Sequence, residues 1–303
     1  MYRYRLVLSH RKCYTTAIRV HSVEYREKGA MDEEKRDHTG LSRDTAWLLR
    51  NIGSAMREAL NGSMAASELL GRRLEKSELA DEREYLAILR HDQHRLLHIA
   101  ENLTELGNLS LGDAERENSV QDLNAICGEI VETVSAMVRR VSFSFAPCRD
   151  TCFVSGSRNR LEALVLNVLA YSLHRCEEGD TITLRTERTE DEVRLFIEDN
   201  SRGMEGESIA TLYSALEQDP LHGATQGGAG LDLLVAEGIA GLHGGSLLLS
   251  AKQDSGMEAV LTLPRCRTSI LRVRGAEYGG RLRGILTILA DELSRDKYMA
   301  PYL

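Results

Sequence analysis

The feature that most constrains the fold is a narrow apolar seam between residues 85 and 106. Along this stretch apolar side chains recur alternately four and three residues apart, a pattern typical of a coiled coil that only Asp92 interrupts. The apolar positions are Tyr85, Leu89, Leu96, Ile99, Leu103 and Leu106. A second helical pattern covers Thr45 to Leu70, and the polar stretch from Gly71 to Asp81 separates the two. The sequence therefore predicts a hairpin of two long helices. One hairpin buries little apolar surface, so we expect two hairpins to pair into a four-helix bundle.

The rest of the chain alternates helical and strand patterns, which predicts an α+β fold with helices layered on one face of a mixed sheet. The expected helices cover residues 120–139, 160–175 and 231–242, and the expected strands cover residues 141–145, 181–185, 192–197, 246–252 and 257–263. A strand over 270–273 and a helix over 281–293 follow, with no evident role. The predicted units are a basic, disordered arm (1–40), a helical hairpin (41–112), a sandwich domain (113–265) and a C-terminal segment (266–303).

Composition argues against several classes of protein. A length of 303 residues, of which 42% are hydrophobic, suits two modest domains. The net charge of −8 argues against a general nucleic-acid binder. No apolar run approaches the roughly 18 residues that a membrane span needs. Six cysteines at irregular spacing do not suit a disulfide scaffold, so we expect reduced thiols and a cytoplasmic location.

The first 30 residues are basic, with seven lysines and arginines against Glu24 and Glu27. A basic start that is poor in acids and contains serine and threonine is compatible with an organelle transit peptide. It is also compatible with a disordered arm, or with sequence that precedes a translation start at Met31. We prefer the second and third interpretations.

Three stretches downstream carry asparagine and glycine in a fixed order. They read LEALVLNVLAYSLH over 161–174, IEDNSRGM over 197–204 and GGAGLDLL over 227–234, and HGG follows at 243–245. In this order they resemble the asparagine box and the two glycine boxes of the sensor histidine kinase ATP-binding domain, with residues 205–226 in the place of its ATP lid. The resemblance implies an α/β sandwich of the histidine kinase ATPase type. The nucleotide-binding positions that it implies are Asn167, Asp199, Gly203, Gly228 and Gly230.

Upstream, the stretch NIGSAMREALNG over 51–62 is similar to the phosphoacceptor helix of the same family, whose pattern is His-Glu-Leu-Arg-Thr-Pro-Leu-Asn-Gly. Ser54 takes the place of the phosphorylated histidine and Ala55 that of the adjacent acid. A serine hydroxyl is a poor nucleophile without a base, and alanine supplies none. Glu58 stands four residues beyond Ser54, and Ala59 replaces a proline, which predicts a straighter helix. The alternative, which we prefer, is that these small residues serve packing.

The nucleotide boxes also depart from the family pattern. Tyr171 stands where the family has the asparagine that binds Mg²⁺, and a bulky phenol is a weak ligand for that ion. His174 replaces a lysine and Ser201 replaces a glycine. Asp232 replaces the last glycine of the second box, at the start of a helix whose N–H groups would otherwise hold phosphate. Its carboxylate is either a helix-start residue or a sign that protein already fills the phosphate site. Both interpretations predict weak ATP binding and little role for Mg²⁺.

Three histidines on the second helix, His91, His94 and His98, stand three and then four residues apart. This spacing is compatible with a metal-binding face or a substitute phosphoacceptor. Solvated or packing histidines are the commoner case, and we prefer it.

Together these features predict a homodimeric histidine-kinase-like protein of two-component signalling that acts as a catalytically impaired regulator or scaffold. Its expected partners are a true histidine kinase or a response regulator. Two alternatives remain open: an active ATP-dependent protein kinase, and a ligand-free interaction dimer.

Overall fold

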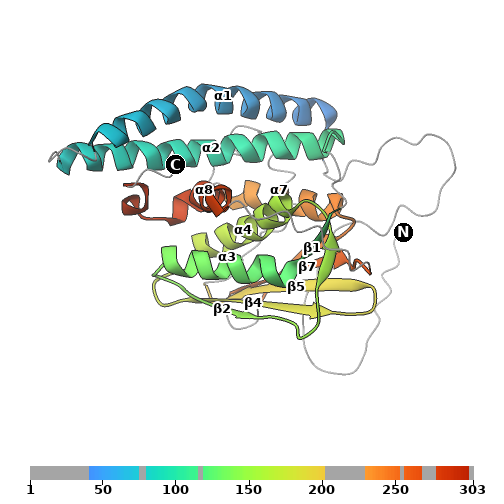
Figure 1. Ribbon diagram of the computed structural model, residues 1–303. Helices are drawn as coiled ribbons and strands as arrows, with labels where there is room; N and C mark the ends of the chain where they lie inside the picture. Colours follow the sequence, from blue (N-terminus) through green and yellow to red (C-terminus); the bar gives the residue numbers. More distant parts are fainter. Residues whose placement is uncertain are drawn as a thin grey trace.

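The computed structural model describes residues 41–74, 80–114, 119–201, 229–252, 256–267 and 278–299. Figure 1 shows the described part of the chain as stacked layers: a hairpin of two long helices, a layer of shorter helices and a sheet. The predicted arm (1–40) and the predicted strand over 270–273 lie outside the described residues. No helix in the ranges described here contains a stretch long and apolar enough to cross a membrane.

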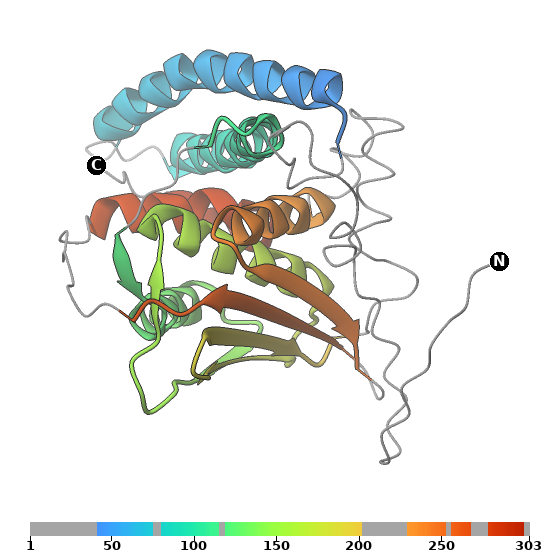
Figure 2. The same cartoon turned by 90° about the vertical axis from the view of Figure 1, so that its right-hand side faces the viewer.

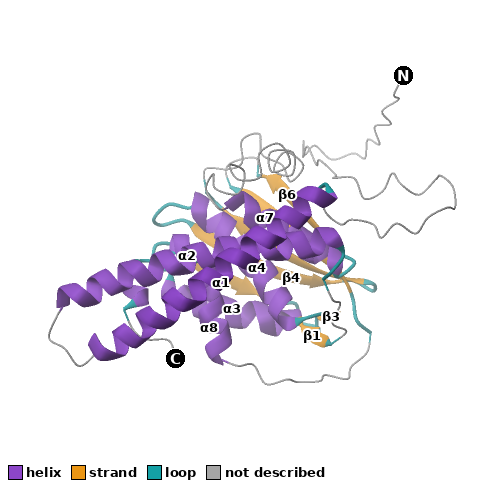
Figure 3. Ribbon diagram, turned by 90° about the horizontal axis from the view of Figure 1, so that it is seen from above, coloured by secondary structure: helices purple, strands orange, loops and turns teal. Residues whose placement is uncertain are grey.

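The hairpin consists of α1 (Arg43–Leu74) and α2 (Ala80–Leu111), as predicted. Both helices are longer than expected. Helix α1 continues past Gly71 and α2 already begins at Ala80, so both extend into the polar stretch that was predicted to separate them. Gly71 is buried there, and a Cβ atom at its position would meet the guanidinium of Arg90. One end of the hairpin projects beyond the sheet (Figure 3).

Two glycines let α1 and α2 approach closely. A Cβ atom at Gly53 would lie 2.5 Å from the Ala100 carbonyl oxygen, and one at Gly107 would lie 2.7 Å from the Ala46 carbonyl oxygen. Each glycine therefore faces the backbone of the opposite helix. The absence of a side chain sets the distance between the helices at these two levels.

A five-stranded mixed sheet forms the base of the molecule, with the strand order β2-β4-β5-β7-β6. Its strands are β2 (Ser142–Ala146), β4 (Thr181–Arg188), β5 (Glu192–Asp199), β6 (Ser246–Ala251) and β7 (Met257–Pro264). The pairing of β2 with β4 is parallel and the other pairings are antiparallel. Alternate residues of β4, β5 and β7 are buried, as expected for a sheet covered by helices on one face.

Three helices cover that face: α3 (Leu123–Met137), α4 (Arg158–Arg175) and α7 (Ala229–Leu242). Figure 2 shows the helical layer on one side of the sheet. The helix predicted over 120–139 is wrong at its start. Residues Val120–Asp122 form β1, which pairs with an unpredicted strand, β3 (Phe153–Ser155), before Asp122 caps α3 through the N–H of Asn124 at 3.0 Å. A cap residue has extended geometry, so the strand leads directly into the helix.

The C-terminal segment returns to the hairpin. It contains α8 (Tyr278–Ile288) and two short 3-10 helices, η1 (Ala290–Glu292) and η2 (Arg295–Tyr298), where one helix over 281–293 was expected. The segment packs on α2 and α4. Tyr298 is fully buried, and its hydroxyl donates to the Leu286 carbonyl at 2.7 Å.

The close approach of α1 and α2 gives a paired prediction. Gly53→Ala should lower the free energy of unfolding by about 1–3 kcal/mol, because the new methyl overlaps α2. Gly62→Ala is the matched control in the same helix, since nothing lies within 4 Å of its Cβ position. It should stabilise the protein by about 0.5–1 kcal/mol through helix propensity. Denaturant titration measures both, and stabilisation by Gly53→Ala would contradict the close contact.

Candidate functional site

Asp199 ends β5 at the edge of the sandwich and is only 2% exposed. One of its carboxylate oxygens, Oδ1, accepts hydrogen bonds from the Ser201 N–H (3.1 Å), the Ser201 hydroxyl (2.8 Å) and the Met257 N–H (3.0 Å). Gly256, with a φ of +94°, lets the turn before β7 pass directly against the Asp199 backbone. Ser201, which departs from the family glycine, thus serves to hold Asp199.

The other carboxylate oxygen of Asp199 is different. Oδ2 is buried and has no hydrogen-bond partner among the described residues. A buried carboxylate oxygen without a donor is costly, so an unpaired one at the edge of a domain suits a ligand that supplies an N–H group. The exocyclic amine of adenine is such a donor. The base end of the implied ATP site therefore fits the residues present.

The other end of the implied ATP site, where Tyr171, His174 and Asp232 stand in the places that would face Mg²⁺ and the phosphates, is here called the phosphate end. Its described residues do not fit Mg·ATP. Tyr171, at the position of the family's magnesium ligand, is 2% exposed and belongs to the hydrophobic core. Its hydroxyl accepts a hydrogen bond from Arg175 at 3.4 Å, and that guanidinium also lies 5.4 Å from the ring centre. His174 is half exposed and has its Nδ1 3.2 Å from a carboxylate oxygen of Glu292. Neither side chain is arranged as a ligand for a cation.

Asp232 lies in the first turn of α7 and is buried against the hairpin. Its Oδ1 accepts a hydrogen bond from the Asn102 side chain at 2.7 Å and lies 3.2 Å from Nε2 of His98. Both partners belong to α2 and are themselves buried. The partners of this carboxylate in the structure are thus side chains of the hairpin, which the sequence did not predict.

The ionisation of His98 follows from this contact. Burial, the largest effect, disfavours the imidazolium, but the Asp232 carboxylate together with Asn167 and the charge of Glu101 outweighs it, and the net effect raises the pKa of His98. The Asn167 side chain on α4 acts in the same direction. Asn167 is almost fully buried, and its side-chain oxygen has no hydrogen-bond partner among the described residues.

The other two histidines bind the C-terminal segment. His91 Nε2 lies 2.9 Å from the Ala290 carbonyl oxygen, and His94 Nδ1 lies 2.9 Å from the Thr287 hydroxyl. Burial, followed by the charges of Arg283 and Arg90, lowers the pKa of His94 to about 4. His91 and His94 therefore hold the C-terminal segment against α2, and within the described ranges no group of three potential ligands is placed to hold a metal ion.

The phosphoacceptor-like positions lie elsewhere. Ser54 is half-buried on α1, while Ala55, Glu58 and Ala59 are exposed. Helix α1 is unbroken at Ala59, although it bows away from the sheet along its length (Figure 2). Helix α2 lies between α1 and the helices of the sandwich (Figure 1), so the structure does not bring Ser54 to the nucleotide positions.

The glycine boxes are described only in part. Gly230 lies in the first turn of α7 and is half-buried. Gly203, Gly228 and the segment predicted as the ATP lid lie outside the described residues.

Sequence reasoning did not single out Asn102. The available signal was a polar side chain one helical turn after His98 on the same helix.

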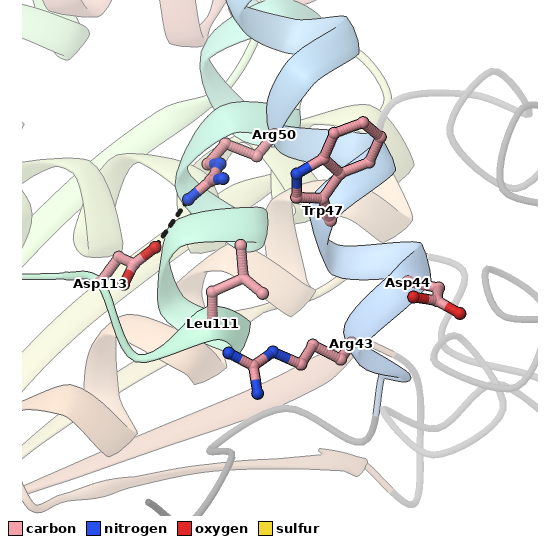
Figure 4. A pocket seen from close by; sticks show the side chains of 6 residues that line it. All are labelled: Arg43, Asp44, Trp47, Arg50, Leu111 and Asp113. Atoms are coloured by element: carbon pink, nitrogen blue, oxygen red, sulfur yellow. Dashed lines mark hydrogen bonds and ion pairs between the residues drawn. The ribbon is translucent and has the colours of Figure 1, made fainter.

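A separate pocket of about 240 Å³ lies at the open end of the hairpin (Figure 4). Trp47 and the ion pair of Arg50 with Asp113, 2.6 Å apart, line it. Its other lining residues are Arg43, Asp44 and Leu111. None of the sequence-predicted site residues contributes to this pocket.

A family model described as histidine kinase-, DNA gyrase B- and HSP90-like ATPase matches residues 156–267. Histidine protein kinase DivJ of Caulobacter vibrioides is 24% identical over 255 residues, which cover 80% of this chain and 41% of DivJ. Sensor protein DegM of a Bacillus species is 25% identical over 149 residues, which cover 48% of this chain and 38% of DegM. The chain thus spans less than half the length of these relatives.

A solved structure shows the same architecture. Full-length ShkA, solved in complex with AMPPNP, superposes with a TM-score of 0.59 at 19% identity, over 74% of this chain and 47% of that chain. At this identity the likeness establishes the fold.

Acid should lower the free energy of unfolding through the protonation of His94. The pKa of His94 falls from 6.5 to about 4 on folding, so its contribution to stability is complete above pH 6.5 and is lost as the pH falls through about 4. The loss is on the order of 3 kcal/mol. Denaturant titration between neutral pH and pH 4 should show a smaller loss in His94→Gln than in the wild type.

His98→Gln is the matched control. The folded-state pKa of His98 is raised, so its contribution is complete below pH 6.5 and is lost as the pH rises through the folded value. This variant lacks that acid-side gain and should lose more stability than the wild type on acidification. Equal pH profiles for the two variants would contradict the assignment.

Proposed function

The chain belongs to the sensor histidine kinase family, and from that premise we propose that it serves two-component signalling as a regulator or scaffold whose phosphotransfer chemistry is impaired. Its proposed partners are a true histidine kinase or a response regulator, and its proposed location is the cytoplasm. The chain spans less than half the length of its curated relatives, so the proposal concerns residues 1–303 alone.

The observation that carries the proposal is that Asp232 and Tyr171 occupy the positions where the phosphates and Mg²⁺ would bind. The carboxylate of Asp232 stands at the helix start where phosphate would bind, and a triphosphate would meet its negative charge. The phenol of Tyr171 is buried where a compact oxygen ligand is needed for Mg²⁺. These two residues argue against productive binding of Mg·ATP.

The acceptor side supports the same conclusion. Ser54 has no acid beside it, since Ala55 is the neighbour, and α2 separates α1 from the sandwich. A hydroxyl nucleophile needs a base within hydrogen-bond reach. We therefore assign Ser54, Ala55 and Ala59 to the surface and packing of the hairpin.

Nucleotide binding without catalysis remains part of the proposal. The unpaired Oδ2 of Asp199 favours an adenine ring, and ShkA, of the same fold, was solved in complex with AMPPNP. The positions expected to contact the nucleotide are Asn167, Asp199, Gly203, Gly228 and Gly230. Recognition through the base alone would be weak, because the phosphates contribute little.

The proposed dimer uses the hairpin. Tyr85, Leu89 and Leu96 are 69%, 48% and 44% exposed and lie on one face of α2 at heptad spacing. Leu103 and Leu106, at the other end of the predicted seam, are buried within the single chain. The exposed half of the seam therefore remains for a second copy of the hairpin.

ATP should bind weakly and with about the same affinity in Mg²⁺ and in EDTA, as measured by calorimetry. Asp199→Asn should weaken binding about 10–100-fold, the usual cost of losing a hydrogen bond to a charged group. Glu198→Gln is the matched control, because this neighbouring carboxylate pairs with Lys252 at 3.0 Å instead. Tight Mg²⁺-dependent binding, together with acid-labile phosphate on the protein from labelled ATP, would establish the active-kinase alternative.

The dimer prediction concerns Leu89 and Leu96. Replacing both with Glu should convert a dimer into a monomer in light scattering, with little change in the stability of the single chain. Met299→Glu is the control, since Met299 is 50% exposed away from the seam. Leu103 is unsuitable for the test, because a charge there would disrupt the interior of the protomer. A wild-type protein that is monomeric at micromolar concentration would refute the proposed dimer.

A further inference from the structure

Two cysteines share the loop over residues 147–152, which joins β2 to β3. Cys148 near its start is half-buried, whereas Cys152 at its end is fully buried. Their thiol groups lie within hydrogen-bond reach of each other. All five cysteines that the structure describes are free thiols. The loop therefore places one accessible thiol directly beside one hidden thiol.

Both cysteines contact the same side chain, Thr186 of β4, which is only 3% exposed. The Thr186 hydroxyl accepts a hydrogen bond from the Cys148 N–H at 2.8 Å and also contacts the Cys152 thiol. The same hydroxyl donates to the side-chain oxygen of Asn124 at 2.6 Å. Because the two cysteines converge on one buried hydroxyl of the sheet, the folded domain keeps their thiols close together.

Two further side chains hold the loop between the cysteines. The Asn124 amide, at the start of α3, donates to the carbonyl oxygens of Cys148 and Asp150, both at 3.2 Å. Arg188, at the end of β4, pairs with the Asp150 carboxylate at 3.0 Å and donates to the Thr151 carbonyl oxygen at 3.3 Å. Since the loop is already ordered, a covalent bond between its two thiols costs little further entropy in the folded state.

The two thiols differ in reactivity. Burial is the main cause that raises the pKa of Cys152 to about 12, and the neighbouring Cys148 adds to it. Cys152 therefore stays protonated at neutral pH, and a protonated thiol is a poor nucleophile. Cys148 is the thiol that a dissolved reagent can reach. The arrangement suits an accessible attacking thiol with a resolving thiol behind it.

We propose that Cys148 and Cys152 form a reversible redox site that low-molecular-weight disulfides oxidise. The Cys148 thiolate attacks one sulfur of the reagent RSSR, so that a mixed disulfide forms and RS⁻ departs. The Cys152 thiol then gives up its proton and attacks the Cys148 sulfur, so that the bond between the two cysteines forms and a second RS⁻ departs. In total the two thiols lose two electrons and two protons, and the reagent takes them up to become two RSH.

This redox site lies toward the opposite end of the sheet from Asp199. Asp199 pairs with Ile182 of β4, and Thr186 lies four residues further along the same strand. At about 3.3 Å per residue the separation is about 13 Å. The inference therefore does not depend on nucleotide binding or on the proposed function. In a cytoplasm that keeps thiols reduced, the bond should form only while low-molecular-weight disulfides accumulate.

The experiment incubates the full chain with oxidised and reduced glutathione at a series of ratios. Trypsin cleaves after Arg149, between the two cysteines. A bond between Cys148 and Cys152 therefore links two separate peptides, residues 141–149 and 150–158, which mass spectrometry identifies. At an oxidising ratio the linked pair should appear with a mass loss of two hydrogen atoms, and dithiothreitol should restore the separate peptides.

Three variants assign the roles of the thiols. All proteins carry Cys13→Ser, because this cysteine lies outside the described residues and its pairing would complicate the peptide map. Cys152→Ser should stop at the mixed disulfide, with one glutathione attached to Cys148. Cys148→Ser should leave Cys152 unmodified, because that thiol is buried. Cys266→Ser is the matched control, a half-buried cysteine outside the loop, and it should form the bond as the parent does.

Three results would overturn the inference. One is the absence of the linked peptides at every glutathione ratio. Another is a bond between Cys152 and Cys127 of α3, the other buried thiol near it, in place of the bond to Cys148. The third is a Cys152→Ser protein that carries no glutathione on Cys148, since the accessible thiol would then not be the one that attacks.

Discussion

The arrangement depends on one helix, α2, being buried from two sides at once. Along one side it packs on α1 through the close approaches at Gly53 and Gly107. Along another it meets α7, α8 and the two short 3-10 helices. The strip of α2 that carries Tyr85, Leu89 and Leu96 stays exposed and remains for another molecule.

Three of the departures from the family pattern are explained by contacts inside the chain. The Ser201 hydroxyl donates a hydrogen bond to Asp199, and Tyr171 packs in the core beside Arg175. Asp232 accepts a hydrogen bond from Asn102 of α2. The substituted side chains around the nucleotide boxes that the structure describes have therefore acquired partners inside the chain, whereas Ala55 and Ala59 on α1 are exposed.

The hairpin, the order of the strands and helices and the family were all predictable from the sequence, because they rest on local periodicity and on short motifs. The strand β1 was missed, since its three residues continue directly into α3 and share its apolar pattern. The role of Asn102 and His98 was beyond sequence reasoning for a different reason. Their partner Asp232 lies 130 residues beyond Asn102, and no spacing rule connects two helices that meet only through tertiary packing.

The anchoring of Tyr298 also has a consequence for the order of events during synthesis. Arg90 of α2 donates a hydrogen bond to the carbonyl oxygen of Tyr298, 208 residues later in the chain. At about 5–20 residues per second, a ribosome needs about 10–40 s to make that span. Until the C-terminal segment is made, the part of α2 around His91 and His94 lacks its cover, whereas the hairpin and most of the sandwich can already fold. The nascent chain therefore passes through a long-lived open form, in which a chaperone or an early partner has access to a surface that the finished protein conceals.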